Sequence, residues 1–169
     1  MLELLAPAGS PDAVIAAVQN GADAVYLGFG AHNARRGANN FTEEEFIKAV
    51  RYCHIRGCKV YVTMNTLVAD RELDAALELA RKASEHGADA LLVQDLGLVR
   101  LLRQAVPDLP LHASTQMSIH NLAGVEAAAE LGCTRAVLSR ELSLEQIREI
   151  SRHASIETEV FVHGALCFC

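Results

Sequence analysis

Short apolar runs and helical stretches alternate along the chain at a nearly constant spacing, and this alternation limits the possible folds more than any other feature. The string Gly21-Ala22-Asp23-Ala24-Val25 recurs as Gly87-Ala88-Asp89-Ala90-Leu91, and more loosely from Gly132 onward. At each of these places a helix is predicted to end on a glycine, and a buried strand to begin within a few residues. Regular repeats of this kind indicate parallel strands joined by right-handed helical crossovers.

Seven strands and six helices follow from this pattern. The strands are predicted at Leu2–Ala6, Ala24–Gly28, Lys59–Met64, Ala90–Val93, Leu109–Ala113, Arg135–Leu138 and Thr158–Val162. The helices are predicted at Pro11–Gln19, Glu43–Arg56, Asp70–Glu85, Gly97–Ala105, Leu122–Leu131 and Leu144–Arg152. These elements favour an incomplete (β/α)8 barrel of the TIM type over an open doubly wound sheet. Such a sheet would place a glycine-rich phosphate turn after its first strand, and Pro7-Ala8-Gly9-Ser10 is not that turn.

The length predicts one barrel-like domain over residues 1–169 that ends before the last strand, because a complete barrel typically needs about 250 residues. Unpaired strand edges beside the missing segment would favour self-association. With 51% hydrophobic residues the chain is not disordered, and no apolar run approaches the roughly 20 residues of a membrane span, so no membrane partner is expected. The net charge of −6 excludes a generally basic surface for nucleic acid.

The five cysteines are an odd number in a chain with a large apolar core, which indicates reduced thiols and a cytoplasmic location. Cys53 and Cys58 have a spacing that zinc can accept. However, no second ligand pair follows them, and we interpret both as ordinary buried thiols.

Polar residues gather where the predicted strands end, which is the face where barrels of this type form their active sites. The candidate catalytic residues are Asp95, Glu141 and His163. The candidate substrate-binding residues are Arg35, Asn65, His112, Ser114, Gln116 and Arg140. We expect Asn65, Asp95, Gln116, Glu141 and His163 to lie on one rim with their side chains converging on a common cleft. The alternative for each residue is a helix cap or an internal hydrogen-bonded layer, and for Arg35 a solvated loop.

Two of these groups depend on a local pattern. Strand alternation would turn His112, Ser114 and Gln116 to one side of their strand, facing a ligand in the barrel. Arg35 lies in a long loop rich in glycine and asparagine, where its guanidinium could bind a carboxylate or phosphate with two hydrogen bonds.

Six strings in the same order resemble the collagenase-like peptidase family, peptidase family U32, over essentially the whole chain. They are Glu3-Leu4-Leu5-Ala6-Pro7-Ala8-Gly9, Gly21-Ala22-Asp23-Ala24-Val25-Tyr26-Leu27-Gly28, Asn33-Ala34-Arg35, His112-Ala113-Ser114-Thr115-Gln116, Ser139-Arg140-Glu141-Leu142-Ser143 and Val162-His163-Gly164-Ala165-Leu166-Cys167.

The resemblance implies an oxygen-independent hydroxylase that acts on RNA, either at the tRNA wobble uridine or on ribosomal RNA. It also implies a [4Fe–4S] cluster and prephenate as the source of the hydroxyl group. Cys167 matches the first cluster cysteine, the other three would follow beyond Cys169, and the fragment alone is then expected to be inactive. The alternatives are a peptidase that uses Asp95, Glu141 or His163 around a water molecule, and a hydroxylation factor of ubiquinone biosynthesis.

Overall fold

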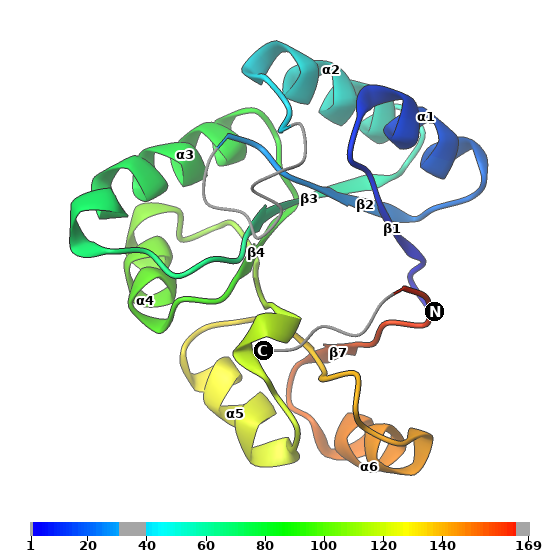
Figure 1. Ribbon diagram of the computed structural model, residues 1–169, viewed down its shortest axis with the longest axis vertical. Coiled ribbons are helices and arrows are strands. Elements are labelled where there is room, and N and C mark those ends of the chain that lie inside the picture. Colours follow the sequence, from blue (N-terminus) through cyan, green and yellow to red (C-terminus); the bar gives the residue numbers. More distant parts are fainter. Residues whose placement is uncertain (1, 31–39, 165–169) are drawn as a thin grey trace.

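The computed structural model describes residues 2–30 and 40–164. Within these ranges seven parallel strands pair in sequence order, from β1 to β7. They are β1 (Leu5–Pro7), β2 (Ala24–Leu27), β3 (Lys59–Met64), β4 (Ala90–Val93), β5 (Leu111–Ala113), β6 (Arg135–Val137) and β7 (Glu157–Glu159). Figure 1 shows that the sheet curls round on itself, so that β7 returns toward the N-terminal side of the molecule. The predicted incomplete TIM-barrel-like fold is confirmed.

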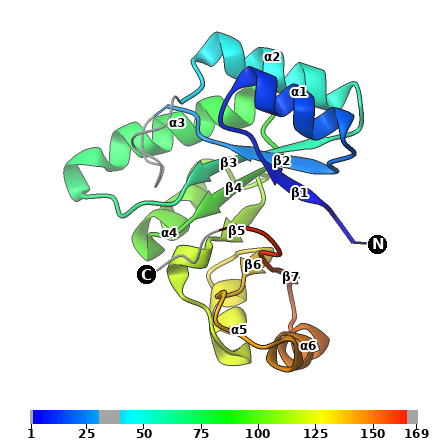
Figure 2. The same ribbon diagram turned by 45° about the vertical axis from the view of Figure 1, so that its right-hand side comes forward.

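Six helices follow the strands and lie on the outside of the curled sheet (Figures 1 and 2). In the described ranges they are α1 (Pro11–Gln19), α2 (Glu43–His54), α3 (Leu73–Glu85), α4 (Leu96–Ala105), α5 (Leu122–Glu130) and α6 (Leu144–His153). Local sequence explains three of the helix starts, because Ser10 caps α1 and both Thr42 and Ser143 form capping boxes. None of the helices in the described ranges is long and apolar enough to cross a membrane.

Strand alternation sorts the core into two layers. On β3, Val60 and Val62 pack in the large cluster between sheet and helices, whereas Tyr61 belongs to a smaller cluster with Ala24 and Ala90 on the concave face. The helical layer therefore contains most of the apolar core, and the inside of the barrel is narrow and partly polar.

The amino end of the barrel interior holds a charged network. The guanidinium of Arg135 on β6 donates from Nη1 to Glu3 at 2.7 Å and from Nε and Nη2 to Glu157 at 2.9 and 2.6 Å. Its Nη1 also lies 3.4 Å from Glu159 on β7, and Glu3 accepts hydrogen bonds from Lys59 at 2.9 Å. This network, which we call the amino-end network, links the first and last strands without a backbone ladder between them.

The alternation expected for His112, Ser114 and Gln116 runs past the end of its strand. β5 ends at Ala113, and Thr115–Met117 form a short 3-10 helix that Ser114 caps through its hydroxyl oxygen. Side chains in a 3-10 turn do not alternate across a sheet. The expectation that Gln116 continues the row of His112 and Ser114 is therefore wrong, although Gln116 still lies just past the strand.

Candidate functional site at the carboxyl rim

Five predicted residues follow the carboxyl ends of five neighbouring strands. Asn65 comes directly after β3, Asp95 follows β4, Gln116 follows β5, Glu141 follows β6, and His163 follows β7. Because all strands of this sheet are parallel, these positions share one edge of the barrel, which we call the carboxyl rim. The predicted placement on one rim is confirmed.

Both carboxylate oxygens of Asp95 bind backbone N–H groups of neighbouring loops and helices. Its Oδ1 accepts a hydrogen bond from the backbone N–H of Leu98 at 2.8 Å and caps α4. Its Oδ2 accepts from the backbone N–H of Val68 at 3.3 Å, which fixes the loop after β3. The expectation that Asp95 converges on a common cleft is wrong, since the unpaired N–H groups at a helix start bind the carboxylate.

His112 and Ser114 lie inside the barrel, as predicted. The His112 ring is 4% exposed and packs edge-on against Tyr61, with 4.9 Å between the ring centroids. Burial, together with the positive charge of Arg135, lowers the pKa of His112 to about 3. The ring is therefore neutral at physiological pH. Above it, the Ser114 hydroxyl accepts a 3.5 Å hydrogen bond from Asn65, so residues after β3 and β5 meet.

Arg140 lies between the loops that follow β6 and β7. Its guanidinium carbon is 3.8 Å from the centroid of the Phe161 ring. A Cβ atom placed on Gly164 would lie 3.8 and 4.0 Å from its two terminal nitrogens. Two of the strings that carry the family resemblance, the one around Arg140 and the one around His163, therefore meet in space.

Buried polar side-chain atoms without a hydrogen-bond partner gather on this side of the barrel. In the described part of the chain they are Thr66 Oγ1, His112 Nδ1, Gln116 Oε1 and Arg140 Nε. All four residues lie on or just after β3, β5 or β6, and three of them lie beyond the strand ends. Nearly all buried polar atoms in folded proteins are paired, so each of these atoms needs a partner among water, a ligand or residues outside the described ranges.

His120 is a rim residue that the sequence did not reveal. Its Nδ1 lies 2.7 Å from the Ser118 carbonyl oxygen and 3.2 Å from the Ser139 hydroxyl, and its Nε2 lies 3.6 Å from Glu141. No sequence motif marks His120, because Ser139 and Glu141 are about 20 residues away in the chain and only the barrel brings them near it.

The set of Ser139, His120 and Glu141 has the composition of a hydrolytic triad but not its geometry. A carbonyl oxygen can only accept a hydrogen bond, so the Nδ1 of His120 carries the proton toward Ser118. The nitrogen that faces Ser139 is therefore unable to take the proton from that hydroxyl, as a serine nucleophile requires. This arrangement gives a serine-nucleophile mechanism at Ser139 no support.

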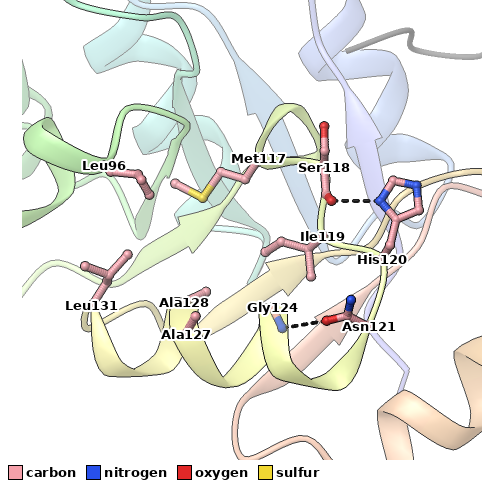
Figure 3. A pocket seen from close by; sticks show the side chains of 10 residues that line it. All are labelled: Leu96, Met117, Ser118, Ile119, His120, Asn121, Gly124, Ala127, Ala128 and Leu131. Atoms are coloured by element: carbon pink, nitrogen blue, oxygen red, sulfur yellow. Dashed lines mark hydrogen bonds between the residues drawn. The ribbon is translucent and has the colours of Figure 1, made fainter.

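A cavity of about 410 Å³ adjoins the carboxyl rim and shares His120 with it. Figure 3 shows its lining, which comes from the start of α4, the segment after β5 and one face of α5. Leu96, Met117 and Leu131 make it largely apolar, while Ser118 and His120 form one edge. None of the predicted site residues lines this cavity.

Two predicted site residues, Arg35 and Cys167, lie outside the described residues. In the part of the chain that the structure describes, no three metal-ligating side chains come together. Cys53, Cys58 and Cys133 are buried thiols, and each lies near the amino end of a strand, opposite the carboxyl rim. Burial raises the pKa of Cys53 to about 12 and that of Cys133 to about 11, which disfavours the thiolate that binds metals. These three residues do not fit an iron–sulfur cluster.

The fold is that of an incomplete α/β barrel, and polar side chains follow the carboxyl ends of its strands. The family model described as peptidase family U32 matches residues 9–169, and the chain belongs to this family. The solved structure of a U32 peptidase superimposes with a TM-score of 0.76 at 19% identity, covering 95% of this chain and 68% of that one.

Named relatives come from two functional groups. The 23S rRNA 5-hydroxycytidine C2501 synthase of Escherichia coli is 42% identical over 98% of this chain and 25% of its own length. The tRNA hydroxylation protein P of Escherichia coli is 40% identical over 98% of this chain and 37% of its own length. A protein named collagenase from Porphyromonas gingivalis is 31% identical over 98% of this chain and 42% of its own length. The chain thus spans less than half the length of each relative.

Proposed function

We propose that this chain is the barrel portion of an enzyme that hydroxylates RNA, either tRNA at the wobble uridine or ribosomal RNA. The observation that carries the proposal is the similarity, over 98% of the chain, to relatives named for hydroxylation of 23S rRNA and of tRNA. The carboxyl rim supports it, because the unpaired polar atoms of His112, Gln116 and Arg140 would serve a polar small-molecule substrate.

The proposal gives the rim residues different tasks. Asn65, His112, Ser114, Gln116 and Arg140, with Arg35 from outside the described residues, would bind substrate. Glu141 and His163, both exposed at the rim, would provide the acid–base groups, and Asp95 would support the rim as the cap of α4. With a net charge of −6, the RNA-binding surface would be a local patch of this chain or would lie in another part of the protein.

Prephenate as hydroxyl donor, independence of molecular oxygen and a [4Fe–4S] cluster with Cys167 as one ligand belong to the same proposal. They rest on the family resemblance. The described cysteines are unsuited to such a cluster, so its remaining ligands would come from elsewhere in the protein.

Deleting the gene and digesting cellular RNA to nucleosides tests this function. We expect mass spectrometry to show the loss of one hydroxylated nucleoside from tRNA or from 23S rRNA. The wild-type gene and a variant at the exposed Arg152, Arg152→Ala, should restore it. Cys167→Ser should fail to restore it, and the purified variant should contain less iron. An unchanged set of nucleosides in the deletion strain would refute the proposed function.

A further inference from the structure

Two arginines lie at opposite ends of β6, and they differ in whether a carboxylate pairs with them. Arg135 begins the strand, and three of its nitrogens donate to carboxylates of the amino-end network. Arg140 follows the strand at the carboxyl rim, and no carboxylate of the described residues pairs with it. A guanidinium that is half-buried and lacks an anion is unusual, because the loss of water is then not offset.

The surroundings of Arg140 hold its guanidinium in a fixed plane. The Phe161 ring covers one face at 3.8 Å from the guanidinium carbon. This contact leaves the edge of the guanidinium, where all five N–H donors lie, as the part that can meet a ligand. The backbone of Gly164 runs beside the terminal nitrogens, with a positive φ of 119° that favours glycine.

The Nε of Arg140 is buried and has no hydrogen-bond partner in the described part of the chain. Nε is therefore closed to a ligand, and the planar pair of terminal nitrogens is the part that matches the two oxygens of a carboxylate. On the same rim the Oε1 of Gln116 is also buried and unpaired, and it can only accept a hydrogen bond.

We propose that Arg140, stacked on Phe161, is the binding group for the carboxylate of a small organic acid at the carboxyl rim. The proposal deepens the proposed function, on which it rests, because it assigns the anionic end of the second substrate to one residue. A phosphate offers the same oxyanion chemistry, so the test separates the two sources.

Calorimetric titration of the purified protein with prephenate, succinate and inorganic phosphate tests the proposal. We expect at least one of the two carboxylic acids to bind, and Arg140→Lys to weaken its binding at least about tenfold, because lysine keeps the charge but loses the planar fork. Phe161→Leu should weaken binding about threefold, since the ring orients the guanidinium. Arg152→Lys, an exposed change on α6, should leave binding unchanged.

Three results would overturn the proposal. They are no binding of either acid, binding of phosphate alone, and equal binding by wild type and Arg140→Lys when both have the same circular dichroism spectrum. Failure of the proposed function is a separate result. A protein that binds an acid through Arg140 but hydroxylates no RNA would retain the carboxylate site and lose the RNA assignment.

Discussion

The buried ring of His112 makes the free energy of unfolding depend on pH in the acid range. Its pKa is about 3 in the fold, whereas an unperturbed histidine titrates near 6.5. Between pH 6.5 and pH 3, His112 therefore binds a proton in the unfolded chain but not in the folded protein. Stability from the neutral ring is complete above pH 6.5 and decreases below it, by at most about 1.4 kcal/mol per pH unit. Urea unfolding at pH 7, 5.5 and 4.5 measures this decrease.

The variant His112→Phe keeps an aromatic contact with Tyr61 and removes the titrating group. We expect its free energy of unfolding to change little over the same pH range. The matched control His153→Gln, at an exposed position at the end of α6, should retain the wild-type slope. An equally steep slope in His112→Phe would show that another group dominates above pH 4.5.

At the scale of elements, the amino-end network holds β7 near the segment before β1. The Arg135 side chain is 10% exposed, and removing one partner of a buried charge pair costs about 3 kcal/mol or more. We therefore expect Arg135→Met to lower the free energy of unfolding by about that amount. The exposed control Arg152→Met should change it by less than about 0.5 kcal/mol. Equal stabilities of the two variants in urea would contradict the role of the network.

The variant Arg135→Met also tests whether the unpaired edges of β1 and β7 cause self-association. In the described chain β1 pairs only with β2, and β7 only with β6. Self-association of the fragment remains a prediction, and light scattering should show it increasing with concentration and further in Arg135→Met. A compact monomer for both proteins over a wide concentration range would argue that the outer edges are protected.

At the scale of the whole molecule, features that depend on near neighbours in sequence were predictable. The helix ends at Gly21 and Gly87 were predicted from glycine itself, because a helix that ends just before a strand needs a residue with positive φ. Both glycines adopt positive φ in the structure. Contacts between distant segments were not predictable. The Arg135 and Glu3 side chains meet across 132 residues only because the sheet curls.

In the candidate site, too, some features could be predicted from the sequence and others could not. Placement on the carboxyl rim follows from strand order, and it was predicted for Gln116 and Arg140. The orientation of each side chain depends on local competition for hydrogen bonds, which turned Asp95 to the start of α4 and ended β5 before Gln116. The position of Arg140 over Phe161 depends on two loops that the sequence separates by about 20 residues.

The most direct test of the central claim is oxygen transfer to RNA in a purified system. The full-length protein, prepared without oxygen, is incubated with prephenate and with tRNA and ribosomal RNA from the deletion strain, and nucleosides are then analysed by mass spectrometry. We predict that one pyrimidine nucleoside gains a single oxygen atom, and that it does so only when prephenate is present. If RNA stays unmodified while the same preparation cleaves a collagen-type peptide, the protein is a peptidase and the account is wrong.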